Sequence, residues 1–232
     1  MDSIDGVVFG SEVVPYKDFP GLYSRGRIAD DSRGYQTDQL ESEWKEIINS
    51  DRNLSSEEAR ELLHQICIWS GKAGKVFVWP QLEKEDHNKL VVIVKSACKT
   101  AREFLSLSTE SRTEELIDLT LATVVAEFDK LYGVSTSYAS KFTRFVLPDY
   151  SAVLDSFIAE ELNISPPTTD KYVAYSKACR IIASNLNSLE VERPFVSLSS
   201  DANNNAFKEK LVWRSADIDL ALWVFADDKR PK

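Results

Sequence analysis

The chain has 232 residues, 43% of them apolar, so it can bury one large core or two small lobes that share an interface. It contains no run of about 18 apolar residues, and its first ten residues lack the basic and apolar stretches of a signal peptide. We therefore expect a cytoplasmic protein with no membrane partner. The three cysteines lie far apart and the chain has only two histidines, which argues against a disulfide framework, a metal site or another cofactor.

The net charge of −9 is unusual for a protein that binds DNA, because phosphate contacts normally use lysine and arginine. The charge is uneven along the chain. Residues 64–102 carry an excess of basic side chains, whereas residues 1–63 and 103–132 are acidic. This distribution is compatible with DNA binding but gives it no positive support.

Apolar residues at helical spacing recur along most of the chain and alternating strand patterns are scarce, so the fold class is predicted to be all-α. Residues 1–36 are rich in glycine and proline, and we expect them to be mainly irregular, with one short strand segment at 6–14. A two-lobed helical domain is expected at 37–232. Its predicted helices cover 37–48, 55–69, 86–105, 111–132, 137–147, 156–162, 169–186 and 215–225, and a surface loop is expected at 190–206.

Helix starts are indicated by polar residues that can cap them. Ser55 with Glu58 and Ser111 with Glu114 have the spacing of capping boxes, and Asp86 can cap a third helix. The five apolar residues at 90–94 would also suit a strand, but the longer flanking pattern favours a helix.

A turn of small residues, Gly133 to Thr136, joins two of these helices. Glycine supplies the positive φ angle of a tight turn, and the free N–H groups of the following helix favour a phosphate oxygen without any lysine. An acidic protein could hold DNA in this way. The predicted phosphate contacts are Gly133, Val134, Ser135, Thr136 and Ser137. Taken alone, the turn fits an ordinary connection between helices better.

The context of the turn carries more information. Leu131-Tyr132-Gly133-Val134-Ser135, the later Val153-Leu154-Asp155-Ser156 and the closing Asp219-x-Ala221-Leu222-Trp223 together resemble the helix-hairpin-helix DNA glycosylase superfamily, in particular bacterial proteins of the 8-oxoguanine-glycosylase fold. The resemblance is close over 131–158 and looser over 69–225. It implies a helix-hairpin-helix DNA glycosylase fold with its hairpin at 131–147. It also implies that Asp155 is the catalytic aspartate, at the start of the next helix.

One position departs from the family pattern. Bifunctional members carry a lysine nucleophile where this chain has Ser137, and Lys141 follows one helical turn later on the same face. Either the enzyme is monofunctional, working through Asp155 and a water molecule, or Lys141 has a catalytic or substrate-holding role. We favour the monofunctional route. A carboxylate such as Asp155 would stabilise the oxocarbenium-like charge that builds on the sugar and orient the water.

The resemblance implies double-stranded DNA with a modified base as the partner. The base must leave the stack and enter a pocket, for which Trp69, Tyr150 and Trp213 are the predicted walls. Lys72 and Lys75 are candidate phosphate contacts, although a solvated turn explains them equally.

The missing lysine favours a bulky or hypermodified base over 8-oxoguanine. The resembled subgroup includes antiviral glycosylases that remove glucosylated hydroxymethylcytosine from phage DNA. Phage defence and base-excision repair both stay open, as do a non-catalytic helix-hairpin-helix DNA-binding module and a helical interaction protein with no role on nucleic acid.

Overall fold

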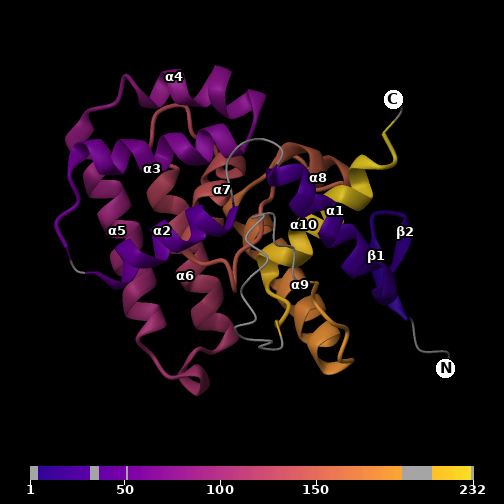
Figure 1. Cartoon of the computed structure of the whole chain (residues 1–232). Helices are drawn as coiled ribbons and strands as arrows, with labels where there is room; N and C mark the ends of the chain where they lie inside the picture. The colour runs from indigo at the N-terminus through magenta and orange to yellow at the C-terminus, as the bar shows by residue number, and fades with distance from the viewer. Residues whose placement is uncertain (1–4, 32–36, 51, 195–210, 231–232) are drawn as a thin grey trace, which may run out of the picture.

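The computed structural model describes residues 5–31, 37–50, 52–194 and 211–230. The all-α prediction is confirmed, because these ranges form ten α-helices and one two-stranded antiparallel sheet (Figure 1). None of the described helices is long and apolar enough to cross a membrane. The α-helices are α1 (Phe19–Asp31), α2 (Thr37–Asn49), α3 (Ser56–Trp69), α4 (Trp79–Leu82), α5 (His87–Leu105), α6 (Glu114–Phe128), α7 (Thr136–Val146), α8 (Ser156–Glu161), α9 (Thr169–Ser188) and α10 (Ser215–Asp227). The strands are β1 (Gly6–Phe9) and β2 (Glu12–Pro15), and short helical turns form at η1 (Tyr16–Asp18), η2 (Gly74–Val78) and η3 (Thr109–Ser111).

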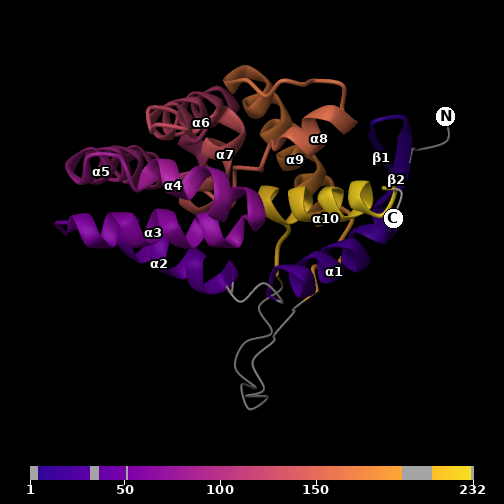
Figure 2. The ribbon, with the colours of Figure 1, turned by 90° about the horizontal axis from the view of Figure 1, so that it is seen from above.

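The helices form two lobes, which Figures 1 and 2 show side by side. Helices α2 to α7 make one lobe, while α1, α8, α10 and the sheet make the other. Helix α9 packs on α6 and α7 of the first lobe and on α10 of the second. The second lobe therefore combines the beginning and the end of the chain, and a site between the lobes draws on distant parts of the sequence.

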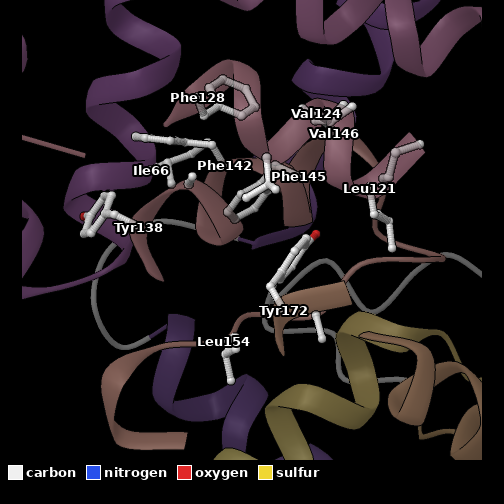
Figure 3. Close-up of a cluster of buried hydrophobic side chains, with 14 of the residues drawn as sticks. Ile66, Leu121, Val124, Phe128, Tyr138, Phe142, Phe145, Val146, Leu154 and Tyr172 are labelled. Carbon is white, nitrogen blue, oxygen red and sulfur yellow. The ribbon is translucent and has the colours of Figure 1, made fainter. Parts of the chain in front are cut away.

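Helix α7 lies at the centre of the first lobe and is buried over most of its length. Figure 3 shows its aromatic side chains among those of neighbouring helices. The ring of Phe142 lies 5.2 Å from that of Phe128 and 5.5 Å from that of Tyr138, measured between centroids. Close packing of this kind allows little movement, so the buried side chains of α7 are held in fixed positions.

Three predicted helix caps are confirmed. Ser55 and Glu58 form the capping box of α3, and Asp86 caps α5 by accepting from the N–H of Asn88 at 2.9 Å. Asp155 caps α8, and its Oδ1 accepts from the N–H of Ile158 at 2.9 Å.

The start and end of α6 differ from the prediction. Ser111 lies in η3, where its hydroxyl contacts that of Ser108 at 3.0 Å, so it does not cap the helix. Thr113 takes that place and accepts from the N–H of Leu116. The helix ends at Phe128, several residues before the predicted end at Tyr132.

The prediction of an irregular segment over 1–36 is wrong for the part that the structure describes. The single strand expected at 6–14 is a hairpin of β1 and β2, with Gly10 at φ +60° in its turn. Helix α1 follows and packs on α10. Its proline lies in the first turn, where the missing N–H costs no hydrogen bond. Gly26 of α1 is buried and lets the two helices lie close together, because a Cβ there would lie 2.6 Å from Cγ of Leu220 on α10.

The surface loop expected at 190–206 falls largely outside the described residues, which stop at 194 and resume at 211.

Candidate active site

A cavity of about 330 Å³ lies between the two lobes. Its walls come from the end of α3 and the following turn, from α7, from the segment before α8 and from α10. It is lined by Trp69, Ser70, Gly71, Lys72, Lys141, Arg144, Val153, Asp155, Ala216, Asp219, Leu220 and Trp223. Four predicted site residues, Trp69, Lys72, Lys141 and Asp155, thus meet in one place.

Asp155 is half-buried at the edge of this cavity. Its hydrogen bond to Ile158 fixes the direction of the carboxylate through Oδ1. Among the described residues, no hydrogen bond engages Oδ2. The residue can therefore cap α8 and present an oxygen to a ligand at the same time.

Lys141 reaches the same cavity from α7, and its Nζ lies 5.0 Å from the centre of the Tyr138 ring. Ser137, one turn earlier, is half-buried and is not part of the lining. The cavity thus contains Lys141 and not Ser137.

Two indole rings line the cavity. Trp69 is held by a hydrogen bond from its Nε1 to Oγ1 of Thr37 at 3.2 Å, and its ring meets the edge of Phe145. Trp223, on α10, is the second indole, and the predicted walls did not include it. It follows Asp219 by one helical turn, so both side chains lie on the same face of α10.

The other two predicted wall residues lie elsewhere. Trp213 is 3% exposed, and its Nε1 donates to the carbonyl of Val191 at 2.8 Å, so it belongs to the core of the second lobe. Tyr150 accepts a hydrogen bond from Arg112 at 3.0 Å and lines a separate groove of about 430 Å³ beside α2. Tyr150 is close to Asp155 in the sequence, but it does not line the cavity that Asp155 lines.

The positive φ angle expected at Gly133 is confirmed. Gly133 has φ +77°, and a Cβ there would lie 2.8 Å from Cβ of Gln81 on α4. The N–H of Val134 bonds to the carbonyl of Leu131. Within the described residues, no protein acceptor takes the N–H groups of Ser135, Thr136 and Ser137. These donors at the start of α7 are suited to an anion.

The charges beside the hairpin are mixed. Glu85 accepts from the N–H of Tyr132 at 2.8 Å and is paired with Lys89 at 2.7 Å, so part of its charge is balanced. Lys72 is exposed and lines the cavity, while Lys75 is exposed on η2 and is not in the lining. Of the two predicted lysine contacts, only Lys72 therefore adjoins the cavity.

A second carboxyl group, Asp219, lines the cavity and is 7% exposed. The hydroxyl of Tyr175 donates to its Oδ1 at 2.9 Å. Burial raises the pKa of Asp219 to about 7, with a smaller contribution from the charge of Asp155, while the bond from Tyr175 and the charge of Arg144 act against the rise. The sequence singled out this residue only as part of a family motif.

The raised pKa predicts how stability depends on pH. Asp219 ionises near 3.8 when exposed but near 7 in the folded protein, so the unfolded state loses the proton first. Stability is therefore lost as the pH rises from about 4 to about 7, and this loss is complete at higher pH. Asp219→Asn, which never ionises, should melt several degrees above the parent at pH 8, with the difference vanishing near pH 4.

Thermal unfolding followed by circular dichroism at both pH values tests this, with Asp170→Asn on the exposed face of α9 as the control. An equal shift at pH 4 and pH 8 would contradict the assignment.

No protein-family model, curated protein or solved structure matches this chain. No group of three histidine, cysteine, aspartate or glutamate side chains in the described part of the chain could hold a metal ion. A function must therefore be inferred from the arrangement of the hairpin, the cavity and the carboxyl groups.

Proposed function

We propose that this protein is a DNA glycosylase, which extrudes a modified base from double-stranded DNA and hydrolyses its N-glycosidic bond. The observation that carries the proposal is the link between hairpin and acid. Among the described residues, nothing accepts from the N–H groups at the start of α7, and Asp155, after the loop that follows α7, lines the cavity between the lobes. A duplex held by phosphate at the hairpin would have its neighbouring nucleotides close to this cavity.

The cavity suits a base that has left the stack. Its volume lies in the range of small-molecule sites, which begins at about 300 Å³. The indoles of Trp69 and Trp223 offer apolar surfaces for stacking, and polar groups of Asp155, Asp219 and Lys141 offer hydrogen bonds. Such a combination of flat apolar walls and a few polar groups is what reading a flipped base requires.

Asp155 has the leading chemical role in this proposal. Its carboxylate stabilises the positive charge that develops on the deoxyribose as the base departs, and it orients a water molecule towards C1′. Lys141 holds the substrate from the opposite element, α7. The enzyme is then monofunctional, and it leaves an abasic site with the DNA strand intact.

The proposed substrate is a hypermodified cytosine, such as the glucosylated hydroxymethylcytosine of phage DNA, which makes phage defence the proposed role. Mass spectrometry of bases released from several DNAs tests this, with the phage DNA beside duplexes that contain 8-oxoguanine. We expect release of the glucosylated base by the parent protein and not by Asp155→Asn. Base release from none of these DNAs, with retained affinity for duplex, would instead support a non-catalytic DNA-binding module.

The hairpin makes a separate prediction. Gly133→Ala forces a Cβ against Gln81 in a backbone conformation that alanine adopts poorly, so the turn should shift and its donors should lose their alignment. We expect the affinity for duplex DNA to fall about tenfold or more, as measured by fluorescence anisotropy at several salt concentrations.

A matched control exists in the N-terminal hairpin. Gly10 also has positive φ, and a Cβ there would lie 3.1 Å from the carbonyl oxygen of Glu161, far in sequence from the proposed DNA contacts. Gly10→Ala should lower the melting temperature without changing DNA affinity. Affinity equal to that of the parent in Gly133→Ala would exclude the hairpin as the phosphate contact.

A further inference from the structure

Two carboxyl groups reach the cavity from different elements and in different environments. Asp155 is half-buried at the start of α8, where a helix N–H holds one oxygen. Asp219 is almost fully buried on α10, where the hydroxyl of Tyr175 on α9 donates to its Oδ1 at 2.9 Å. Two acids in unequal environments commonly take different roles in breaking a glycosidic bond, one as the charged group and the other as the proton donor.

We propose that Asp219 is a second catalytic residue, which donates a proton to the departing base, and that the substrate is therefore a neutral base. This inference rests on the glycosylase function proposed above. A neutral base leaves with a negative charge unless it is protonated, whereas an alkylated, cationic base needs no proton to leave. A proton donor in the cavity would therefore assist the release of a neutral base, whereas the release of a cationic base would not require it.

The surroundings of Asp219 raise its pKa far enough that a large share of the group is protonated near pH 7. Burial and the negative charge of Asp155 raise the pKa of Asp219 to about 7, while Arg144 on α7 partly opposes them. On α9, Tyr175 donates its hydrogen bond and Cys179 lies close enough for its own pKa to be raised by the charge of Asp219. Lys141 and Lys72 are the other charged groups on the cavity wall. A protonated carboxyl group retains one O–H donor for a ligand.

The proposed step balances in atoms and charge. The bond between C1′ and the base nitrogen breaks, and its electron pair goes to the base. The proton of Asp219 moves to an oxygen or ring nitrogen of that base, which departs neutral. The oxygen of water bonds to C1′ and its proton passes by way of Asp155 to the solvent. Asp219 then regains a proton from the solvent for the next turnover.

Single-turnover rates of base release between pH 5.5 and pH 9 test the role, with phage DNA containing glucosylated hydroxymethylcytosine as the probe. The rate of the parent should fall about tenfold per pH unit above pH 7, because the unprotonated acid is inactive. Asp219→Asn should be at least about tenfold slower at pH 6 and independent of pH, because its amide cannot give up a proton.

Tyr175→Phe tests the pH dependence of the rate, which would not change if Asp219 had only a structural role. The hydrogen bond from Tyr175 lowers the pKa of Asp219, so its loss raises that pKa and should shift the alkaline fall in rate to higher pH. Tyr172→Phe is the matched control, because Tyr172 is a buried tyrosine of the same helix whose hydroxyl bonds to Ser151 at 2.8 Å. Its pH profile should equal that of the parent.

The outcomes separate this inference from the function on which it rests. A parental pH profile in Asp219→Asn, or a rate lowered by the same factor at every pH in both Asp219 and Tyr175 variants, overturns the role of Asp219 as an acid. The glycosylase function still holds in that case, provided Asp155→Asn is inactive. Absence of base release by the parent from every DNA overturns both.

Discussion

Asp155→Asn should lower the single-turnover rate of base release at least about 100-fold while the fold and the affinity for DNA stay close to those of the parent. The rate falls because the amide carries no charge to stabilise the sugar cation, and loss of one such electrostatic group commonly costs a factor of 100 to 1000. The fold is retained because asparagine caps helices as well as aspartate does. Its side-chain oxygen can still accept from the N–H of Ile158.

The chain provides a matched control for this substitution. Asp86 caps α5 through the same kind of bond, to the N–H of Asn88 at 2.9 Å, and it does not line the cavity. Asp86→Asn should therefore show the same small effect on melting temperature and no effect on rate. Equal rates for Asp155→Asn and Asp86→Asn would mean that Asp155 is a structural cap and that the proposed reaction is wrong.

The local parts of this fold could be predicted from the sequence. A capping residue and its partner lie within three positions of each other, so Ser55 with Glu58, Asp86 and Asp155 were found correctly. Thr113 and Ser111 both suit the start of α6, and the choice between them depends on the preceding turn at η3. Local sequence signals limit the start of such a helix to a few residues but do not decide between them.

The parts that depend on tertiary packing could not be predicted. Helix α1 contains Pro20, Gly21 and Gly26, which favour irregular structure in isolation, and its packing on α10 overrides them. The predicted lining of the cavity was incomplete for the same reason. Helical spacing places Asp219 and Trp223 on one face of α10, but only the packing of α10 on α1, α8 and α9 turns that face towards the cavity that Asp155 lines.

A group of charged side chains near the cavity joins the two lobes. Glu41 on α2 pairs with Arg144 of α7 at 3.0 Å and with Arg214, just before α10, at 2.7 Å. Arg214 also pairs with Asp217 of α10 at 3.0 Å. Burial alone would raise the pKa of Glu41, but the charges of Arg144 and Arg214 outweigh burial and lower it. The pairs thus hold Glu41 in its charged form between elements of both lobes.

Glu41→Gln should reduce the free energy of unfolding by about 3 kcal/mol, because it leaves two largely buried guanidinium groups without their shared counter-charge. In a chain of this size the melting temperature should fall by roughly 6–12 °C at neutral pH. Since the folded pKa of Glu41 is lowered, its contribution is present above the ordinary value of 4.5 and is lost as the pH falls through the folded pKa. The difference between variant and parent should therefore shrink in acid.

Glu46→Gln, on the exposed face of the same helix, should change the melting temperature by about 2 °C at most, since exposed substitutions of this kind usually cost under about 0.5 kcal/mol. A shift for Glu41→Gln as small as that of Glu46→Gln would show that the pairs do not hold the lobes together. Arg144 also lies 5.5 Å from the centre of the Trp69 ring, so the same pairs position one wall of the cavity. Base release by Glu41→Gln should consequently slow well below its melting temperature, with the alkaline fall in rate still governed by Asp219.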